Sequence, residues 1–192
     1  MSIRMMTTTR PRLLTIEEWI QLPDADQYEL IDGFLRARMV NQNQHEFTVL
    51  RLAYFLNHYL LQPGNSGKVL GSNTRYRVRA RRGIMPDVSV VLGAKGSKIG
   101  RRAAYNTVGP DLAVEVLSPD QGLEYLEERL DDYWKLGTEE VWIADPEAET
   151  LTGYARQDRC YEIFARAQGD EEFESRLLPG LRFSVGLLWM RE

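Results

Sequence analysis

An apolar pattern runs through DLAVEVLSP, residues 111–119, with almost no alternation between apolar and polar side chains. A continuous run of this kind predicts a strand that is buried on both faces of a sheet. Glu115 interrupts the run near its centre. A buried ionised carboxylate is unfavourable unless a cation neutralises it, so Glu115 either forms a structural salt bridge or binds a metal ion.

A second carboxylate upstream favours the metal site. Asp87 follows Pro86 and opens the apolar run of residues 88–92, which predicts another strand. Carboxylates that are carried by neighbouring strands are suitable ligands for a hard divalent cation. Asp87 and Glu115 are therefore the first candidates for a metal-binding pair.

Turn signals, capping signals and apolar periodicity divide the rest of the chain into short elements. We expect helices at 15–21, 41–61 and from Ser118 to Gly137, a hairpin of strands 28–31 and 34–40 turned by Asp32-Gly33, and further strands at 68–70, 74–80, 140–145, 151–156 and 160–165. Strand, helix and strand between residues 111 and 145 predict a right-handed crossover between parallel strands. The pattern as a whole predicts one α/β domain.

The helix of residues 41–61 places a histidine on its apolar face. His45 extends toward the N-terminus a stripe that consists of Val49, Leu52, Leu56 and Tyr59. His45 is then either a packing residue or part of a site. Glu29, between apolar neighbours in the first strand of the hairpin, is a further polar candidate.

Arginines alternate with apolar residues in the strand of residues 74–80. Arg75, Arg77 and Arg79 share one face of that strand. Such a row either keeps a sheet edge soluble or binds the phosphates of a nucleic acid. The Gly-containing loop of residues 93–109 is also basic, and a loop of this length in a compact domain is often functional.

The helix that we expect to start with Ser118 as N-cap and Pro119 at its first position has Arg129 at the border of its apolar stripe. The stripe consists of Leu123, Leu126, Leu130, Tyr133 and Trp134. From the border of the stripe, Arg129 either reaches back toward the sheet or pairs with acidic residues at the surface.

Composition excludes several classes of protein. The chain has 192 residues, 43% hydrophobic and 27% charged, which suits one globular domain over residues 1–192 with a loose arm at residues 1–12. One cysteine, Cys160, and two histidines argue against a disulfide framework and against a zinc site. Because we find no signal peptide or membrane span, we expect a cytoplasmic protein without a membrane partner.

Net charge and the absence of certain motifs argue against further classes of protein. The net charge of −4 argues against general affinity for nucleic acids, although a basic stripe can still bind a phosphate backbone locally. No GxSxG, Walker A or dinucleotide motif is present, so serine hydrolases and nucleotide-binding folds find no support.

The order and spacing of several motifs resemble one family. The motifs are YELIDG at 28–33, the helical His45, PDVSVV at 86–91, DLAVEVLSP at 111–119, and DDYWKLG followed by EVWIADP. Together they resemble the Uma-two family of endonucleases, in the PD-(D/E)XK nuclease superfamily. The resemblance runs from Thr15 to the LPGL stretch at 178–181, which is nearly the whole chain.

The resemblance implies a restriction-endonuclease-like fold, with a mixed central β-sheet flanked by helices. It implies Mg²⁺ or Mn²⁺ as cofactor and DNA as partner. By motif position, Asp87 and Glu115 would bind the metal, and the Val116 carbonyl is a further candidate ligand. Glu29 and His45 match family positions near the same site. A homodimer is expected only by analogy with nucleases that cut both strands.

Three positions depart from the family pattern. Leu117 stands where the superfamily has a lysine, and Arg129 stands at the helix position to which this family has moved that lysine. Arginine keeps the positive charge but does not transfer protons near neutral pH. Phe34 stands where the family often has an acid. Binding would survive these changes more easily than catalysis.

Three hypotheses follow. The first is a metal-dependent endonuclease that hydrolyses phosphodiester bonds in DNA, with Arg129 opposing the charge on the phosphate. The second is a catalytically inactive nuclease fold that binds DNA or mediates oligomerisation. The third is a protein in which Glu115 and Arg129 form a structural ion pair, with no role in nucleic-acid chemistry.

Overall fold

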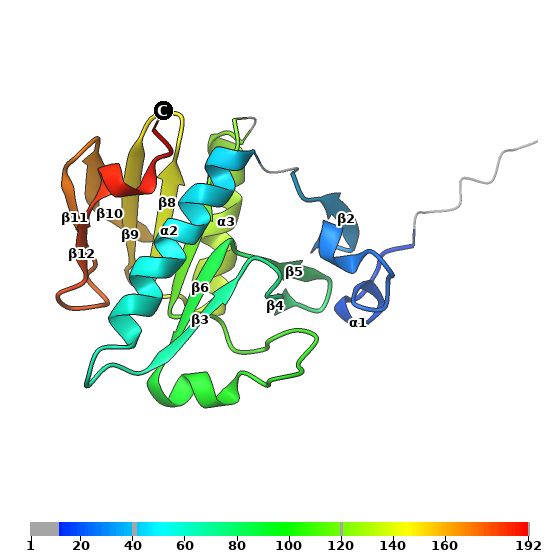
Figure 1. Ribbon diagram of the computed structural model, residues 1–192. Helices are drawn as coiled ribbons and strands as arrows, with labels where there is room; N and C mark the ends of the chain where they lie inside the picture. The colour runs from blue at the N-terminus through cyan, green and yellow to red at the C-terminus, as the bar shows by residue number, and fades with distance from the viewer. Residues whose placement is uncertain (1–11, 40–41, 120, 192) are drawn as a thin grey trace, which may run out of the picture.

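The structure is a computed structural model that describes residues 12–39, 42–119 and 121–191 (Figure 1). Its centre is a six-stranded sheet with the strand order β10-β9-β8-β7-β6-β3. In this sheet β7 and β8 run parallel, and the other neighbours are antiparallel. The strands are β3 Gly67–Gly71, β6 Val88–Leu92, β7 Leu112–Val116, β8 Glu140–Asp145, β9 Thr150–Arg156 and β10 Tyr161–Gln168. The predicted mixed sheet and the parallel crossover are confirmed.

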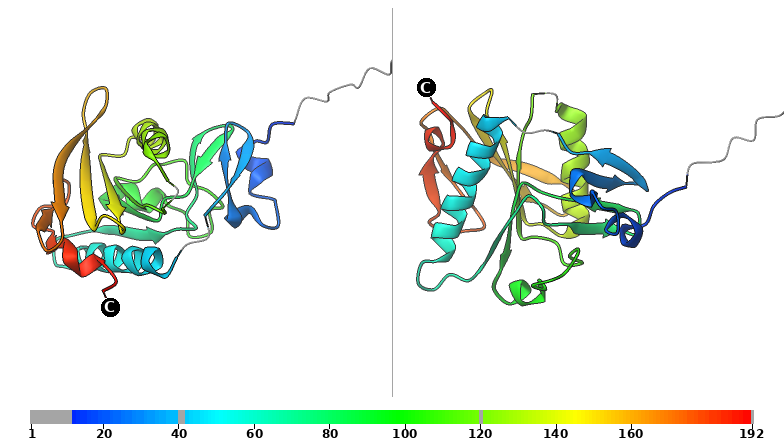
Figure 2. Two further views of the ribbon diagram at one scale, coloured as in Figure 1. Left: turned by 90° about the horizontal axis from the view of Figure 1, so that it is seen from above. Right: turned by 45° about the vertical axis from the view of Figure 1, so that its right-hand side comes forward.

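Two long helices cover opposite faces of this sheet, as Figure 2 shows. Helix α2, Asn43–Leu60, packs on the face to which β7 turns Leu112, Val114 and Val116. Helix α3, Leu123–Leu136, packs on the other face, where Ala113 lies. Because side chains alternate along a strand, Glu115 also points to the α3 face.

A second sheet stands beside the end of the central one (Figure 2). Its strand order is β2-β1-β5-β4, and the members are β1 Tyr28–Ile31, β2 Phe34–Ala37, β4 Tyr76–Arg79 and β5 Arg82–Ile84. Asp32 and Gly33 have φ angles of 54° and 90°, as a two-residue hairpin turn requires. Helix α1, Ile16–Trp19, starts with the predicted capping box of Thr15 and Glu18.

The C-terminal part of the chain packs on the same side of the central sheet as α2. Strands β11, Glu172–Glu174, and β12, Arg182–Ser184, pair with each other and are followed by the short 3₁₀ helix Val185–Leu188. Phe173, Phe183 and Leu188 join the core beneath α2. Phe55 of α2 stacks on Phe183, with ring centroids 4.6 Å apart. The remaining 3₁₀ segments are Ala25–Gln27 and Gly93–Lys98.

Several local predictions were wrong. Helix α3 starts at Leu123 with Gly122 as its N-cap, because the Ser118 N–H is bonded to the Gln121 side chain in a preceding turn. Leu123 is exposed, whereas Arg129 and Asp132 are buried on the helix face that meets the sheets. Strand β5 was not predicted, because Arg81 and Arg82 made this segment look like a charged surface.

The loose arm at residues 1–12 lies, apart from Arg12, outside the described residues. In the part of the chain that the structure describes, no helix has both the length and the apolar character needed to cross a membrane.

Candidate metal and phosphate site

The two predicted acids lie side by side on neighbouring strands. Val88 of β6 pairs with Val114 of the antiparallel strand β7, so the next step of the ladder brings Asp87 opposite Glu115. Asp87 Oδ2 accepts a hydrogen bond of 2.9 Å from the Val116 N–H, which fixes its carboxylate at the start of β6. The fold therefore places next to each other the two carboxylates that the sequence pattern indicated as candidates for a metal-binding pair.

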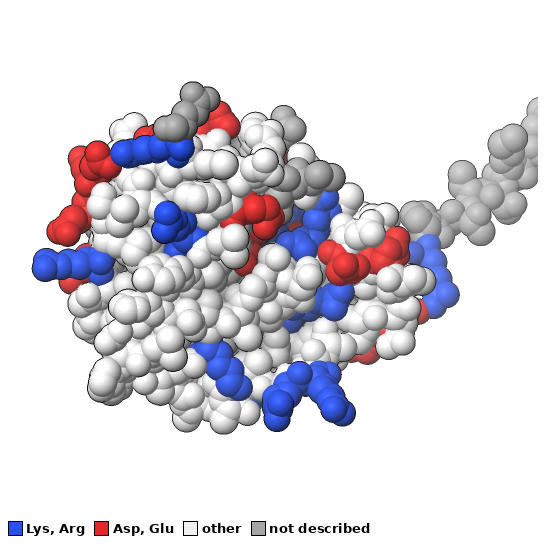
Figure 3. Space-filling view, in the orientation of Figure 1, with Lys and Arg blue, Asp and Glu red and all other residues white. Residues whose placement is uncertain are grey.

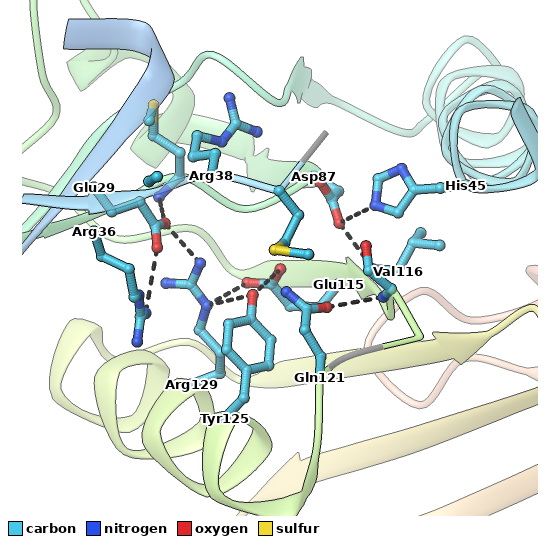
Figure 4. A pocket seen from close by; sticks show the side chains of 14 residues that line it. Glu29, Arg36, Arg38, His45, Asp87, Glu115, Val116, Gln121, Tyr125 and Arg129 are labelled. Atoms are coloured by element: carbon cyan, nitrogen blue, oxygen red, sulfur yellow. Dashed lines mark hydrogen bonds and ion pairs between the residues drawn. The ribbon is translucent and has the colours of Figure 1, made fainter. Parts of the chain in front are cut away.

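Both acids line a cavity of about 240 Å³ between β2, the start of α2, the end of β7 and α3 (Figure 4). The cavity wall contains three carboxylates and three guanidinium groups, together with one histidine. They belong to Glu29, Asp87, Glu115, Arg36, Arg38, Arg129 and His45. Figure 3 shows acidic and basic side chains meeting in the hollow between α2 and the smaller sheet.

Glu115 is held from the α3 side. Its Oε1 accepts a short hydrogen bond from the Tyr133 hydroxyl and lies 3.2 Å from Arg129 Nε. Its Oε2 has a longer contact of 3.4 Å with the Tyr125 hydroxyl. Burial raises the pKa of Glu115 to about 7, Asp87 acts in the same direction, and the Arg129 guanidinium opposes them.

Arg129 is buried, with 3% of its surface exposed, and is not a surface partner at the border of the stripe. Its Nη2 donates to Glu29 Oε1 at 2.6 Å, and its Nε donates to the Tyr125 hydroxyl at 2.9 Å. Burial favours the neutral guanidine, but the charges of Glu115 and Glu29 outweigh it and raise the pKa of Arg129. Nη1 is buried and has no hydrogen-bond partner among the described residues.

Glu29 is placed by the hairpin. Its Oε1 accepts a hydrogen bond of 2.7 Å from the Met85 N–H and also binds Arg129, while its Oε2 lies 3.4 Å from Arg36 Nη2. Both oxygens are thus engaged, which makes Glu29 a residue that positions Arg129 at the cavity wall.

His45 sits in the first turn of α2 beside the acids. Its Nε2 lies 3.4 Å from Asp87 Oδ2, and its Nδ1 lies 3.6 Å from Glu46 Oε1. Burial lowers the pKa of His45, but its contact with Asp87 and the charges of Asp87 and Glu46 outweigh that effect, so the pKa is raised. The structure therefore brings together Glu29, His45, Asp87, Glu115, Val116 and Arg129.

The arginine row of β4 lies elsewhere. Arg77 Nη1 is 3.2 Å from Glu17, Arg79 is paired with Asp32, and Arg75 lies over the Trp19 ring at 5.4 Å from its centre. None of these three arginines lines the cavity. A role for Arg75, Arg77 and Arg79 in nucleic-acid binding stays a prediction.

Arg36, Arg38 and Tyr125 also line the cavity and are among the residues that the sequence did not predict there. A signal for the first was present, because a two-residue turn at Asp32-Gly33 sets Arg36 directly opposite Glu29, as the register shows. Tyr125 lies one helical turn before Arg129, so the spacing of four residues within the predicted helix already indicated that the two share a face.

A row of alternating charges continues from the cavity along α3. Arg36 Nη1 donates to Glu128 at 2.8 Å, and Glu128 also binds Arg82. Arg82 Nε donates to Asp132 Oδ1 at 2.5 Å and Nη2 to Oδ2 at 2.7 Å. This bidentate pair, with Asp132 fully buried, ties β5 of the small sheet to α3.

Replacing Arg82 by Met is expected to lower the free energy of unfolding by about 3–5 kcal/mol, because it leaves Asp132 buried without a cation. Urea unfolding monitored by tryptophan fluorescence measures the loss. Arg79→Met is the matched control on the same hairpin, since Arg79 pairs at the surface and its removal should cost less than about 1 kcal/mol. Equal losses in both variants would contradict this role for the buried pair.

Protein side chains alone do not build a complete metal cage here. Among the described residues, no three His, Cys, Asp or Glu side chains form a group that could hold a metal ion. The site instead offers two adjacent carboxylates, and their less engaged oxygens are Asp87 Oδ1 and Glu115 Oε2.

The comparisons with known proteins concern the family and the fold of the chain. The family model described as "Uma2: Putative restriction endonuclease" matches residues 16–186. No curated protein shows a significant match. A solved crystal structure, described as "a putative nuclease belonging to DUF820 from Anabaena variabilis ATCC 29413", superimposes with a TM-score of 0.74 at 24% identity, over 91% of this chain and 97% of that one. The fold is thus restriction-endonuclease-like, as the resemblance implied, and the chain belongs to the Uma2 family.

Proposed function

We propose that this protein is a metal-dependent nuclease that hydrolyses phosphodiester bonds in DNA. The observation that carries the proposal is the pairing of Asp87 with Glu115 in a cavity that also contains the buried guanidinium of Arg129. Membership of the Uma2 family supports the reaction class. Mg²⁺ or Mn²⁺ and DNA are the finer parts of the proposal.

The donor set fits Mg²⁺. This ion is commonly bound by one or two carboxylates together with water and substrate phosphate, rather than by a cage of protein ligands. Asp87 and Glu115 supply two such carboxylates, and both line the cavity. When bound, the ion would polarise the phosphate and lower the pKa of a water ligand.

The protein's own residues then have distinct tasks. The guanidinium of Arg129 lines the cavity and can oppose the negative charge that grows on a phosphate oxygen during attack. Glu29 holds Arg129 in place through Nη2. His45, beside Asp87, can orient an attacking water or accept its proton when the ring is neutral.

Two contacts of Glu115 favour a second candidate, a nuclease fold that binds DNA without cutting it. Arg129 Nε and the Tyr133 hydroxyl both engage Glu115 Oε1, which ties up part of the ligand that a metal would need. An arginine at this place also cannot exchange a proton as a lysine would. In this candidate the same cavity would bind phosphate and leave it intact.

Plasmid nicking distinguishes the two candidates. Supercoiled plasmid with Mg²⁺ or Mn²⁺ should be converted to the open circle, the conversion should stop after EDTA, and excess Mn²⁺ should restore it. Isothermal titration of Mn²⁺ into the protein should show binding that Glu115→Gln weakens. Retardation of DNA without nicking under either metal would support the binding-only candidate instead.

A further inference from the structure

The β2 side of the cavity carries two arginines that the proposed mechanism does not use. Arg36 lies in β2 and Arg38 directly follows that strand, and both line the cavity. Figure 4 shows them across the cavity from His45. Their backbone still follows the hairpin, because the Arg38 N–H donates to the Gln27 carbonyl at 2.8 Å.

Each of the two carboxylates that bind Arg36 also binds a second arginine. Its Nη2 contact with Glu29 is long, at 3.4 Å, and Glu29 also has the 2.6 Å bond from Arg129. Its other partner, Glu128, is bound by Arg82 as well. About a third of the Arg36 side chain, 34%, is exposed. Its guanidinium can therefore turn to an incoming anion while both carboxylates keep a cation.

Arg38 has no carboxylate partner in the described part of the chain. Its Nη1 donates to the Asp26 carbonyl at 3.4 Å and to the Asn73 side chain at 3.2 Å, both of which are neutral acceptors. A positive charge that has only neutral partners, at the wall of a cavity, attracts anions.

The spacing of the two arginines fits one kind of ligand. Residues two apart on an extended chain have Cα atoms about 6.6 Å apart, and the two guanidinium groups turn to different sides of the cavity wall, that of Arg36 toward Glu128 and that of Arg38 toward Asn73 (Figure 4). Successive phosphates along one nucleic-acid strand have a comparable separation. A planar guanidinium group also binds phosphate through two parallel hydrogen bonds, so it recognises the geometry of the phosphate as well as its charge.

We propose that Arg36 and Arg38 bind successive phosphates of one nucleic-acid strand, beside the phosphate that Arg129 faces. This subsite rests on the proposed function and fixes where the strand runs: along β2, toward the mouth of the cavity. It differs from the β4 row of arginines, in which Arg77 pairs with α1 and Arg79 with the Asp32 turn.

The salt dependence of binding tests the subsite. Fluorescence anisotropy would follow labelled single-stranded and duplex DNA without divalent metal, so that no cleavage interferes, at several salt concentrations. Each lost phosphate contact reduces the slope of log K against log salt by about 0.9 for duplex and about 0.7 for a single strand. Arg36→Gln with Arg38→Gln should therefore reduce the slope by about two contacts, and Arg38→Gln alone by about one.

Arg191→Gln is the matched control, because it removes one positive charge from an exposed ion pair with Asp170, outside the cavity lining. Its slope should equal that of the wild type. An unchanged slope in the double variant, while the wild type binds, would overturn the subsite and leave the proposed function standing. A wild type that binds neither DNA would also overturn the subsite, and plasmid nicking with Mg²⁺ or Mn²⁺ would then decide the proposed function by itself. If the double variant melts early, Arg38→Gln alone decides, because that change removes only contacts to neutral acceptors.

Discussion

Asp87→Asn is expected to abolish plasmid nicking, with an initial rate at least about 100-fold below that of the wild type. Loss of a residue that merely supports a metal ligand costs about 10–100-fold, so loss of a ligand itself should cost no less. The asparagine keeps the shape of the side chain, and its amide oxygen can still accept from the Val116 N–H. Only the negative charge at the cavity is removed.

A gel assay of open-circle formation under Mn²⁺ measures the rate, and a thermal melt checks that the variant is folded. Asp131→Asn on the exposed side of α3 makes the same chemical change at an ordinary surface ion pair, so it should nick like the wild type. Nicking by Asp87→Asn at the wild-type rate would show that the activity comes from elsewhere in the chain or from a contaminant.

The pair of acids was predictable because short-range patterns determine it. The apolar runs before and after residue 100 predicted two buried strands, and their antiparallel pairing sets Asp87, directly before β6, opposite Glu115 in β7. The Asp32-Gly33 turn fixed the hairpin and the place of Glu29. In these cases the alternation of side chains along a strand predicts the face of the sheet on which each residue lies.

The arginines were predicted less well, because their burial depends on partners that are distant in sequence. Arg129 meets Glu29 one hundred positions away, and Arg82 meets Asp132 fifty positions away. An assignment from hydrophobic periodicity treats every charged residue as polar and places it on the protein surface. A guanidinium between carboxylates can lie inside, and only the tertiary structure shows which carboxylates it meets.

Arg129→Met is expected to cause the largest loss of stability, about 3–5 kcal/mol or more in the free energy of unfolding. The substitution leaves the buried Glu115 without its cation, and it leaves the buried Glu29 with only the long contact of 3.4 Å to Arg36. Urea unfolding measures the loss, and nicking should disappear with it. Combining the change with Glu115→Gln should recover part of the stability, because the unpaired buried charge of Glu115 is then removed.

Arg129→Lys separates stability from catalysis at the same position. An ammonium group keeps the charge but loses the fork that reaches Glu29 and Glu115 together, so about 1.5–3 kcal/mol of stability should be lost with one charged hydrogen bond. If the arginine fills the catalytic place of the family's lysine, this variant nicks at least as fast as the wild type. A folded Arg129→Lys protein that binds DNA and metal but never nicks would mean that the cavity serves binding alone.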